Sequence, residues 1–341
     1  MSANTPTVEG TSRGTLLVVD GHSLAFRAFF ALPVENFSTS SGQATNAVWG
    51  FATMLSQVID AEHPDHLAVA FDVKGGTFRN QMLPQYKGTR DAAPEELLSQ
   101  LPLIQQMLTA LGVTYIEKPG YEGDDVIGTL ASMGDQAGYR TLVLSGDRDA
   151  FQLINDDITV LYPGHHFKDL KHMTPDAVQE KYHVSPAQYP DLAALRGETA
   201  DNIPGVPGVG DGFAAKWINQ YGGLEQIIEH ADEISGKKGE ALRENIEQVK
   251  LNRSVNALVR DLDLGVSVSD LTSRRWSTRR SIHQARIRCS DQESRAQNVQ
   301  CGQTIRGRAR IQQARAATCR RRQRSACGGD MGPKPFPRGA G

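Results

Sequence analysis

Acidic side chains follow apolar runs at several points in the first 150 residues of this sequence. Short apolar runs at residues 16–19, 67–71, 115–116 and 142–144 are each followed closely by one or more carboxylates. The carboxylates are Asp20, Asp72, Glu122, Asp124, Asp125, Asp147 and Asp149. Close-set carboxylates repel one another unless a positive charge lies between them. Because Mg²⁺ prefers oxygen ligands and keeps waters for chemistry, these acids predict a divalent-metal site.

The apolar runs that precede the acids belong to an alternation of strands and helices. We expect strands at residues 15–20, 67–72, 113–117, 140–145 and 158–162, helices at 44–61 and 124–137, and a long polar and helical stretch to about 111. This alternation predicts an α/β fold with a mostly parallel sheet covered by helices on both faces. The acids then lie at the carboxyl ends of the strands, where open α/β folds bind ligands.

From about residue 174 the pattern is helical only. Helices are expected at 175–183, 186–195, 213–221, 224–230 and 239–252. The sequence therefore predicts an α/β core at residues 14–173 and a helical annex at 174–271, after a disordered start at residues 1–13.

The net charge of −2 hides two regions of opposite charge. Residues 272–341 hold 16 Arg, one Lys and three acids, a charge of +14, whereas residues 1–271 carry −16. This basic tail contains no Leu or Tyr and shows no apolar period, which is typical of a disordered segment. Three interpretations stay open: a basic arm that grips nucleic acid through Arg320–Arg322, a solvated tail, or translation out of frame.

Composition excludes two further classes of protein. The four cysteines all lie in the basic tail at spacings that match neither a zinc site nor a disulfide framework. No apolar stretch approaches the roughly 18 residues of a membrane span, and residues 1–13 lack the hydrophobic segment of a secretory signal. We therefore expect a soluble, cytoplasmic protein.

A hairpin rich in glycine and proline, residues 201–210, leads into the helix expected near residue 213. Glycines allow close approach of a phosphate, and a helix amino end adds positive potential. The hairpin is equally compatible with an ordinary turn between two helices.

A basic and aromatic cluster lies within the acidic body, at residues 78–79 and 86–90. Its Arg and Lys side chains could hold phosphates while Tyr86 stacks on a base. Taken alone, such a cluster is more often a solvated surface.

Taken together, these segments resemble the 5′ nuclease domain of bacterial DNA polymerase I, a family that includes flap endonucleases and phage 5′ exonucleases. The resemblance covers about residues 14–271 in order. The segments that carry it are Asp20–Ser23 with Arg27, Phe71–Asp72, Thr77–Arg79, Tyr86–Lys87, Glu122–Asp125, Gly146–Asp149 and Asp201–Gly205.

The resemblance implies a PIN-like nuclease core, a helical arch at about residues 74–100 that admits a 5′ strand, and a helix-three-turn-helix that holds duplex DNA. The implied activity is metal-dependent 5′-3′ exonuclease and flap endonuclease cleavage in DNA replication and repair. The implied partners are duplex DNA with a 5′ flap or an RNA primer on DNA. We expect a monomer at the nucleoid of a bacterial cytoplasm.

Site residues are implied by the same resemblance. Two Mg²⁺ or Mn²⁺ ions are expected, the first held by Asp20, Asp72, Glu122, Asp124 and Asp125, and the second or its water shell by Asp147, Asp149, Glu198 and Asp201. Arg27, Lys87 and Arg90 resemble catalytic residues at the scissile or neighbouring phosphates. The expected DNA contacts are Arg79, Tyr86, Gly205, Val206, Gly208, Val209, Gly210 and Lys216, with K⁺ at the hairpin.

The sequence departs from the family pattern at three places. Glu198 stands where relatives usually have Asp, so one outer metal ligand is longer. Asp211-Gly212-Phe213-Ala214 stands where relatives commonly have Glu-Lys-Thr-Ala, which removes a lysine beside the DNA backbone. From Thr272 onward the sequence resembles neither the proofreading-type nor the polymerase domain that normally follows in this family.

Two rival functions stay open. The first, a receiver-like or phosphatase-like Mg²⁺ domain, leaves the hairpin and the annex unexplained. The second is a DNA-binding module of the same fold that has lost cleavage.

Overall fold

The computed structural model describes residues 13–167 and 169–272, and the predictions for the start of the chain and for the basic tail lie outside the described residues. Six strands form one sheet in the order β3-β2-β1-β4-β5-β6. Their bounds are β1 Thr15–Asp20, β2 His66–Phe71, β3 Thr114–Glu117, β4 Arg140–Leu144, β5 Ile158–Pro163 and β6 Leu170–Met173. The first five strands are parallel, and β6 pairs antiparallel with β5. The predicted mostly parallel sheet is confirmed.

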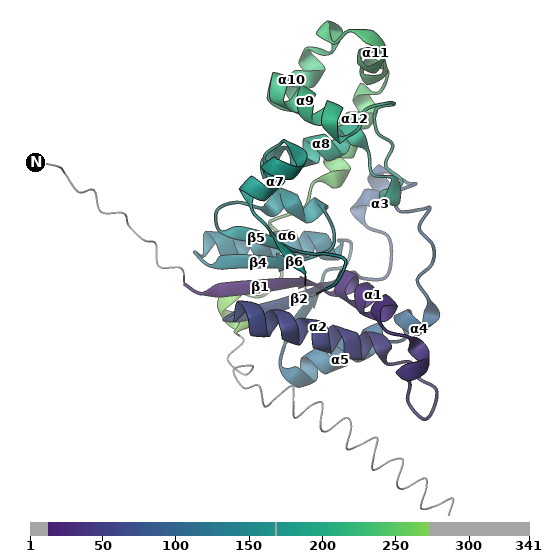
Figure 1. The fold of residues 1–341 in the computed structure, drawn as a ribbon, viewed down its shortest axis with the longest axis vertical. Helices are drawn as coiled ribbons and strands as arrows, with labels where there is room; N and C mark the ends of the chain where they lie inside the picture. The colour runs from purple at the N-terminus through teal and green to yellow at the C-terminus, as the bar shows by residue number, and fades with distance from the viewer. Residues whose placement is uncertain (1–12, 168, 273–341) are drawn as a thin grey trace, which may run out of the picture. The chain divides into compact units, whose positions relative to one another are not determined.

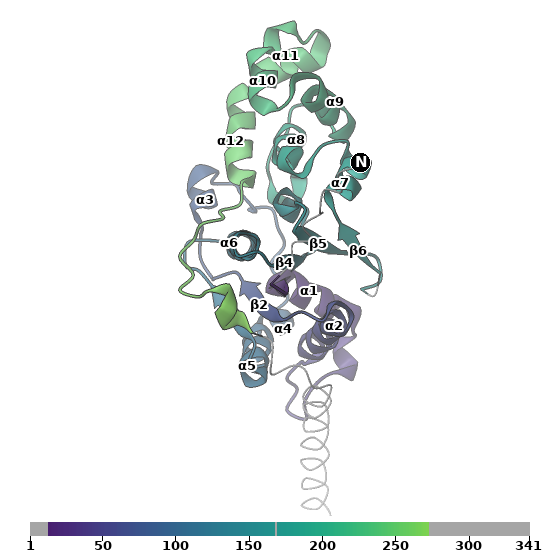
Figure 2. The same cartoon turned by 90° about the vertical axis from the view of Figure 1, so that its left-hand side faces the viewer.

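Strand β1 shows why the sheet is covered on both faces. Its four central residues are fully buried, and alternate side chains enter different cores. Leu17 and Val19 pack with α1 (Gly21–Ala31), α2 (Asn46–Glu62) and α5 (Leu101–Leu111), whereas Leu16 and Val18 pack with α6 (Gly123–Gln136). Figure 2 shows α2 and α5 on one side of the sheet and α6 on the other. A continuous apolar run is what a strand buried on both faces requires.

The annex consists of six helices that share a core with the α6 face of the sheet. They are α7 Pro175–Tyr182, α8 Tyr189–Arg196, α9 Asp211–Tyr221, α10 Leu224–Glu229, α11 Gly236–Glu244 and α12 Ile246–Asn256. Phe151 joins the two parts, because its ring lies 5.8 Å from that of Tyr182 and 5.4 Å from that of Tyr189. Figure 1 shows the annex stacked beyond α6. None of the helices in the described ranges is long and apolar enough to span a membrane.

The expected helical arch at about 74–100 is only partly helical. It contains α3 Phe78–Met82 and α4 Glu95–Leu98, and the residues between them form turns and irregular backbone. Pro84 and Pro94 remove backbone donors, and Lys87 adopts a positive φ of 55°. The sequence pattern also missed α1 and the short strand β6, whose side chains are half exposed.

Candidate active site

Parallel strands bring four predicted acids to one edge of the sheet. Asp20 ends β1, Asp72 directly follows β2, and Asp147 and Asp149 lie just beyond β4. The register pairs Asp20 with Ala70 and Val19 with Leu144, so β1, β2 and β4 end at the same level. Because the strands are adjacent, residues more than 120 positions apart in sequence become neighbours.

The amino end of α6 adds three more acids to this edge. Glu122 is the N-cap, and Asp125 accepts a hydrogen bond from the Glu122 backbone N–H at 3.1 Å. The Gly123 N–H donates to Asp72 at 2.6 Å, which fixes the helix end against the β2 edge. Carboxylates at a helix amino end are stabilised by its dipole and its free N–H groups. Glu122 and Asp125 therefore serve as helix caps, and Asp20 likewise caps α1 by accepting from the Ser23 N–H.

Burial, and then the charge of neighbouring acids, raises the pKa of three acids that form no ion pair with Lys or Arg in the described ranges. Burial raises the pKa of Asp20 to about 6, with smaller contributions from Asp72 and Asp147. Burial and then Asp147 and Asp201 raise the pKa of Asp149 to about 8. The pKa of Asp124 is also raised, by burial and then by Asp147, Asp20 and Asp72. These mutual interactions tie the acids of β1, β2, β4 and α6 into one negative site.

Four of the nine predicted ligands are neutralised by a nearby cation. Both oxygens of Asp125 accept from Arg79, at 2.7 and 2.8 Å, and Glu122 accepts from Lys87 at 2.8 Å. Asp201 pairs with Arg90, and Glu198 pairs with Arg196. Within the described ranges, no three acid, histidine or cysteine side chains stand in position to hold one ion. The donor chemistry fits a hard cation, but in this conformation arginine and lysine satisfy part of the acidic set.

Two predicted DNA contacts are buried in this conformation. Arg79 is only 2% exposed and donates to Asp125, Val255 and Ala257, so it cannot reach a phosphate. Tyr86 is 6% exposed and its hydroxyl donates to Glu122 at 3.1 Å, so its ring cannot stack on a base. Sequence alone did not separate them from surface residues, since their partners lie 36 to 178 positions away.

Lys87 and Arg90 form ion pairs with two of the acids, Glu122 and Asp201. The Lys87 backbone N–H donates to the Asp201 carbonyl at 2.9 Å, and Asn202 donates to the Gln85 carbonyl at 2.9 Å, which ties the irregular arch segment to the annex. Burial lowers the pKa of Lys87, but Glu122 and Asp124 outweigh that effect, so its pKa is raised and it stays charged. Arg27 instead donates to the Gly164 and His165 carbonyls in the β5–β6 connection.

The predicted hairpin combines structural and exposed glycines. A Cβ at Gly205 would lie 2.0 Å from the Arg196 carbonyl oxygen, so this glycine permits two backbone segments to cross. Gly210 has open space beside it, and Gly208, with a φ of +77°, meets only the end of a lysine side chain. Val206 and Val209 are buried, which leaves only their backbone for a ligand, and Lys216 is exposed. Gly208 and Gly210 are therefore the hairpin positions that suit a close phosphate.

Three positioning residues were missed by the sequence pattern. Ser145 donates to Asp20 at 2.8 Å, and His22 accepts from the Asp72 backbone N–H at 3.0 Å. Asn252 is fully buried and donates to the Ala194 and Pro204 carbonyls, which fixes the start of the hairpin. Their only sequence signal is a polar residue inside or beside an apolar pattern.

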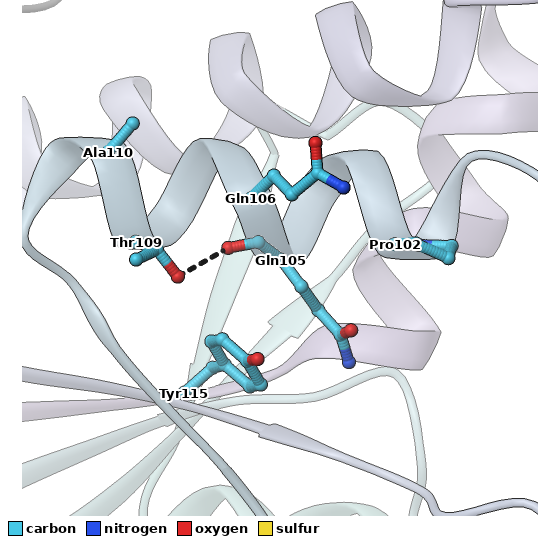
Figure 3. A pocket seen from close by; sticks show the side chains of 6 residues that line it. All are labelled: Pro102, Gln105, Gln106, Thr109, Ala110 and Tyr115. Carbon is cyan, nitrogen blue, oxygen red and sulfur yellow. Dashed lines mark hydrogen bonds between the residues drawn. The ribbon is translucent and has the colours of Figure 1, made fainter.

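A separate hollow of about 440 Å³ lies between α5 and β3, lined by Pro102, Gln105, Gln106, Thr109, Ala110 and Tyr115 (Figure 3). Its lining includes none of the acids or basic side chains described above. We therefore place the chemistry at the acidic edge.

Comparisons with known proteins identify the family of the chain. The family model of the 5′-3′ exonuclease N-terminal resolvase-like domain matches residues 15–183, and the model of the 5′-3′ exonuclease C-terminal SAM fold matches residues 184–279. The boundary between them falls ten residues after the expected change from α/β to helical pattern at 174.

DNA polymerase I proteins are similar in sequence. That of Mycobacterium tuberculosis (strain ATCC 25618 / H37Rv) is 49% identical over 275 residues, 81% of this chain and 30% of the relative. That of Bacillus subtilis (strain 168) is 43% identical over 262 residues, 76% of this chain and 30% of the relative. The chain thus spans about 30% of the length of these relatives.

Solved structures of bacteriophage T5 nucleases share the fold. A T5 protein co-crystallised with metal ions gives a TM-score of 0.61 at 21% identity, covering 72% of this chain and 90% of that one. T5 5′-exonuclease with bound zinc gives 0.59 at 22% identity, with the same coverage.

Proposed function

Because the chain belongs to the 5′-3′ exonuclease family and matches the part of DNA polymerase I that carries this domain, we propose that it hydrolyses phosphodiester bonds near the 5′ end of a DNA strand. The proposed substrates are duplex DNA with a 5′ flap and RNA primers on DNA, cut by a monomer in a bacterial cytoplasm at the nucleoid. The observation that carries the proposal is the convergence of Asp20, Asp124 and Asp149 on Asp147, whose charge contributes, after burial, to the raised pKa of each of the other three.

The proposal includes two divalent cations, Mg²⁺ or Mn²⁺. Asp20, Asp72, Asp124, Asp147 and Asp149 could hold them without breaking an ion pair to Lys or Arg. Such ions would activate a water molecule and neutralise the charge that develops on the phosphate oxygens. The metal ions in the T5 structures, zinc in one of them, support this part of the proposal.

Lys87 and Arg90 are proposed to change partners when substrate binds. Each now neutralises one carboxylate, Glu122 or Asp201, and each extends from the arch segment. Phosphate, like carboxylate, forms strong charge-assisted hydrogen bonds with both cations, so a phosphate at the same place could replace the carboxylate partner. The movement of Lys87 and Arg90 to the phosphate would free Glu122 and Asp201 to become metal ligands. Asp125 and Glu198 would keep their arginine partners and lie outside the inner shell of metal ligands.

The hairpin is proposed to hold the duplex. Gly208 and Gly210 leave room for a phosphate beside the amino end of α9, and exposed Lys216 follows on the same helix. A K⁺ ion bound by hairpin carbonyls belongs to this proposal. Replacing K⁺ by a larger organic cation should then weaken binding to duplex and leave binding to single strands unchanged.

The decisive experiment uses 5′-labelled flap, nicked and double-flap substrates with and without Mg²⁺ or Mn²⁺. We expect cleavage only with metal, at a product length that places the cut near the flap junction. Asp147→Ala should abolish cleavage and leave duplex binding largely intact. Asp156→Ala is the matched control, because Asp156 is an exposed acid at the opposite, amino end of β5. Undiminished cleavage by Asp147→Ala would remove the acidic edge from the mechanism.

A second candidate function is DNA binding without cleavage. It is favoured by one observation, that Glu122, Asp201 and Glu198 already carry cationic partners. Tight flap binding together with no cleavage in either metal would select it.

A further inference from the structure

The exposed face of the hairpin lacks a cation from its own segment. Asp211 opens α9 and is held by Arg196 at 2.9 Å, and Gly212 follows it with open space. A phosphate beside Gly208 or Gly210 therefore meets backbone N–H groups and an acid, but neither Lys nor Arg from residues 205–212. A duplex-binding surface of this kind normally relies on positive charge.

A lysine from a different helix occupies this face. The side-chain atom nearest to the position of a Cβ on Gly208 is Cε of Lys238, at 3.8 Å, although Lys238 lies 30 residues further along in α11. Its Nζ lies 2.9 Å from the centre of the Phe213 ring, and Phe213 is 44% exposed. Among the described residues, no carboxylate forms an ion pair with Lys238. The ammonium is thus held by a ring rather than by an acid.

The start of α11 is rigidly placed. Nη1 of Arg243 donates to the Ala231 and Ile234 carbonyls at 2.6 and 3.0 Å. A Cβ at Gly239 would lie 1.8 Å from the Ile234 carbonyl oxygen, so the helix packs directly on the preceding turn. Leu242 on the next turn is fully buried. These contacts fix the backbone of Lys238 relative to the hairpin.

We propose that Lys238 binds a phosphate of the duplex at Gly208 and supplies the positive charge that the hairpin itself lacks. Phe213 is its positioning residue, because the ring holds the uncompensated ammonium at the hairpin face in the DNA-free protein. This inference rests on the proposed function, and it assigns a DNA contact to a helix outside the hairpin and its following helix.

The expected effect is that of one phosphate contact. Lys238→Gln should weaken binding to a 5′-flap duplex about three- to tenfold at moderate salt and lower the slope of log K against log salt by about 1. Phe213→Leu should weaken binding less, and the double variant should be close to Lys238→Gln alone. The position of the cut should not change.

The experiment measures full-chain affinity for a labelled 5′-flap duplex over a KCl series in the presence of a chelator. The matched control is Lys237→Gln. Lys237 is an exposed lysine on the same turn, and none of its atoms lies within 4 Å of a Cβ placed on Gly208 or Gly210. Circular dichroism melting checks that each variant is folded. If Lys238→Gln and Lys237→Gln have the same affinity and salt slope, the proposal is overturned. If the unaltered chain prefers single strands to duplex, the proposed function fails instead.

Discussion

Individual carboxylates in the site differ in what balances their charge. Asp125 is fully buried with a bidentate arginine, whereas no Lys or Arg lies within ion-pair distance of Asp124 or Asp149 in the described part of the chain. A buried charge without a partner is costly, and such strain is typical of sites that bind a cation. Asp124 and Asp149 thus leave negative charge in the site that a bound cation could neutralise.

The uncompensated charge of Asp149 can be tested by its effect on stability. Its folded pKa is raised to about 8 from an unfolded value near 3.8, so the folded state binds the extra proton and loses stability as pH rises through that window. In chelator, Asp149→Asn should raise the melting temperature by at least a few degrees, more at pH 8 than at pH 5.

The measurement is thermal melting at both pH values with Asp156→Asn as control. Added Mg²⁺ should stabilise the unaltered chain more than the Asp149→Asn variant. A variant that melts below the unaltered chain at pH 8 would show that Asp149 is not strained.

At the scale of elements, Arg79 links three segments. From α3 it reaches Asp125 on α6 and the carbonyls of Val255 and Ala257 at the end of α12. The Val259 N–H also donates to Asp125, at 3.0 Å, so the chain that follows α12 returns to the amino end of α6. The position of α6 thus depends on the annex.

Arg79→Ala should be strongly destabilising because it leaves Asp125 buried without a counter-charge. We expect a loss of about 3–5 kcal/mol in the free energy of unfolding. Lys250→Ala is the control, since both side chains of the Lys250–Glu247 ion pair are exposed and its removal should cost less than about 1 kcal/mol. Urea denaturation measures the free energy of unfolding of both variants, and equal losses would contradict the role of Arg79 in holding the three segments together.

The hairpin makes a second prediction at this scale. Gly205→Ala places a methyl group 2.0 Å from the Arg196 carbonyl, so the annex should lose stability by several kcal/mol or fail to fold. Gly210→Ala meets open space at an ordinary φ of −112° and should melt like the unaltered chain. A comparison of melting temperatures separates the two, and a normal melting temperature for Gly205→Ala would contradict the crossing of the two backbones.

At the scale of the whole molecule, charge is divided unequally. Residues 1–271 carry −16 and residues 272–341 carry +14. An acidic body repels DNA at long range, so its binding must depend on local cations and be sensitive to salt. The family models end at residue 279, before most of the basic tail.

Removal of residues 280–341 tests the role of the tail. If it is a basic arm, the shortened chain should bind DNA of any sequence at least tenfold more weakly at low salt, with a shallower salt slope, and still cut at the same position. A shift in the cut position would mean that the tail takes part in substrate placement. Unchanged affinity would exclude the basic-arm interpretation.

Sequence alone determined the alternation of the main strands and helices, though not α1 or β6, and the edge on which the acids gather. Strands β1, β2 and β4 were expected to within one residue at each end, because a short, continuous apolar run followed by polar residues is typical of a strand buried on both faces. Once the strands are parallel, Asp20, Asp72 and Asp147 must share an edge. Neither step requires knowledge of a distant contact.

Only the tertiary structure decided which partner each charged side chain has. Arg79 and Tyr86 read as surface residues but are buried against α6, and Lys238 reaches a hairpin 30 residues earlier. Such pairings depend on how the annex and the arch segment pack on the sheet, and a change of a few ångströms would exchange one partner for another. The local apolar period carries no information about that choice.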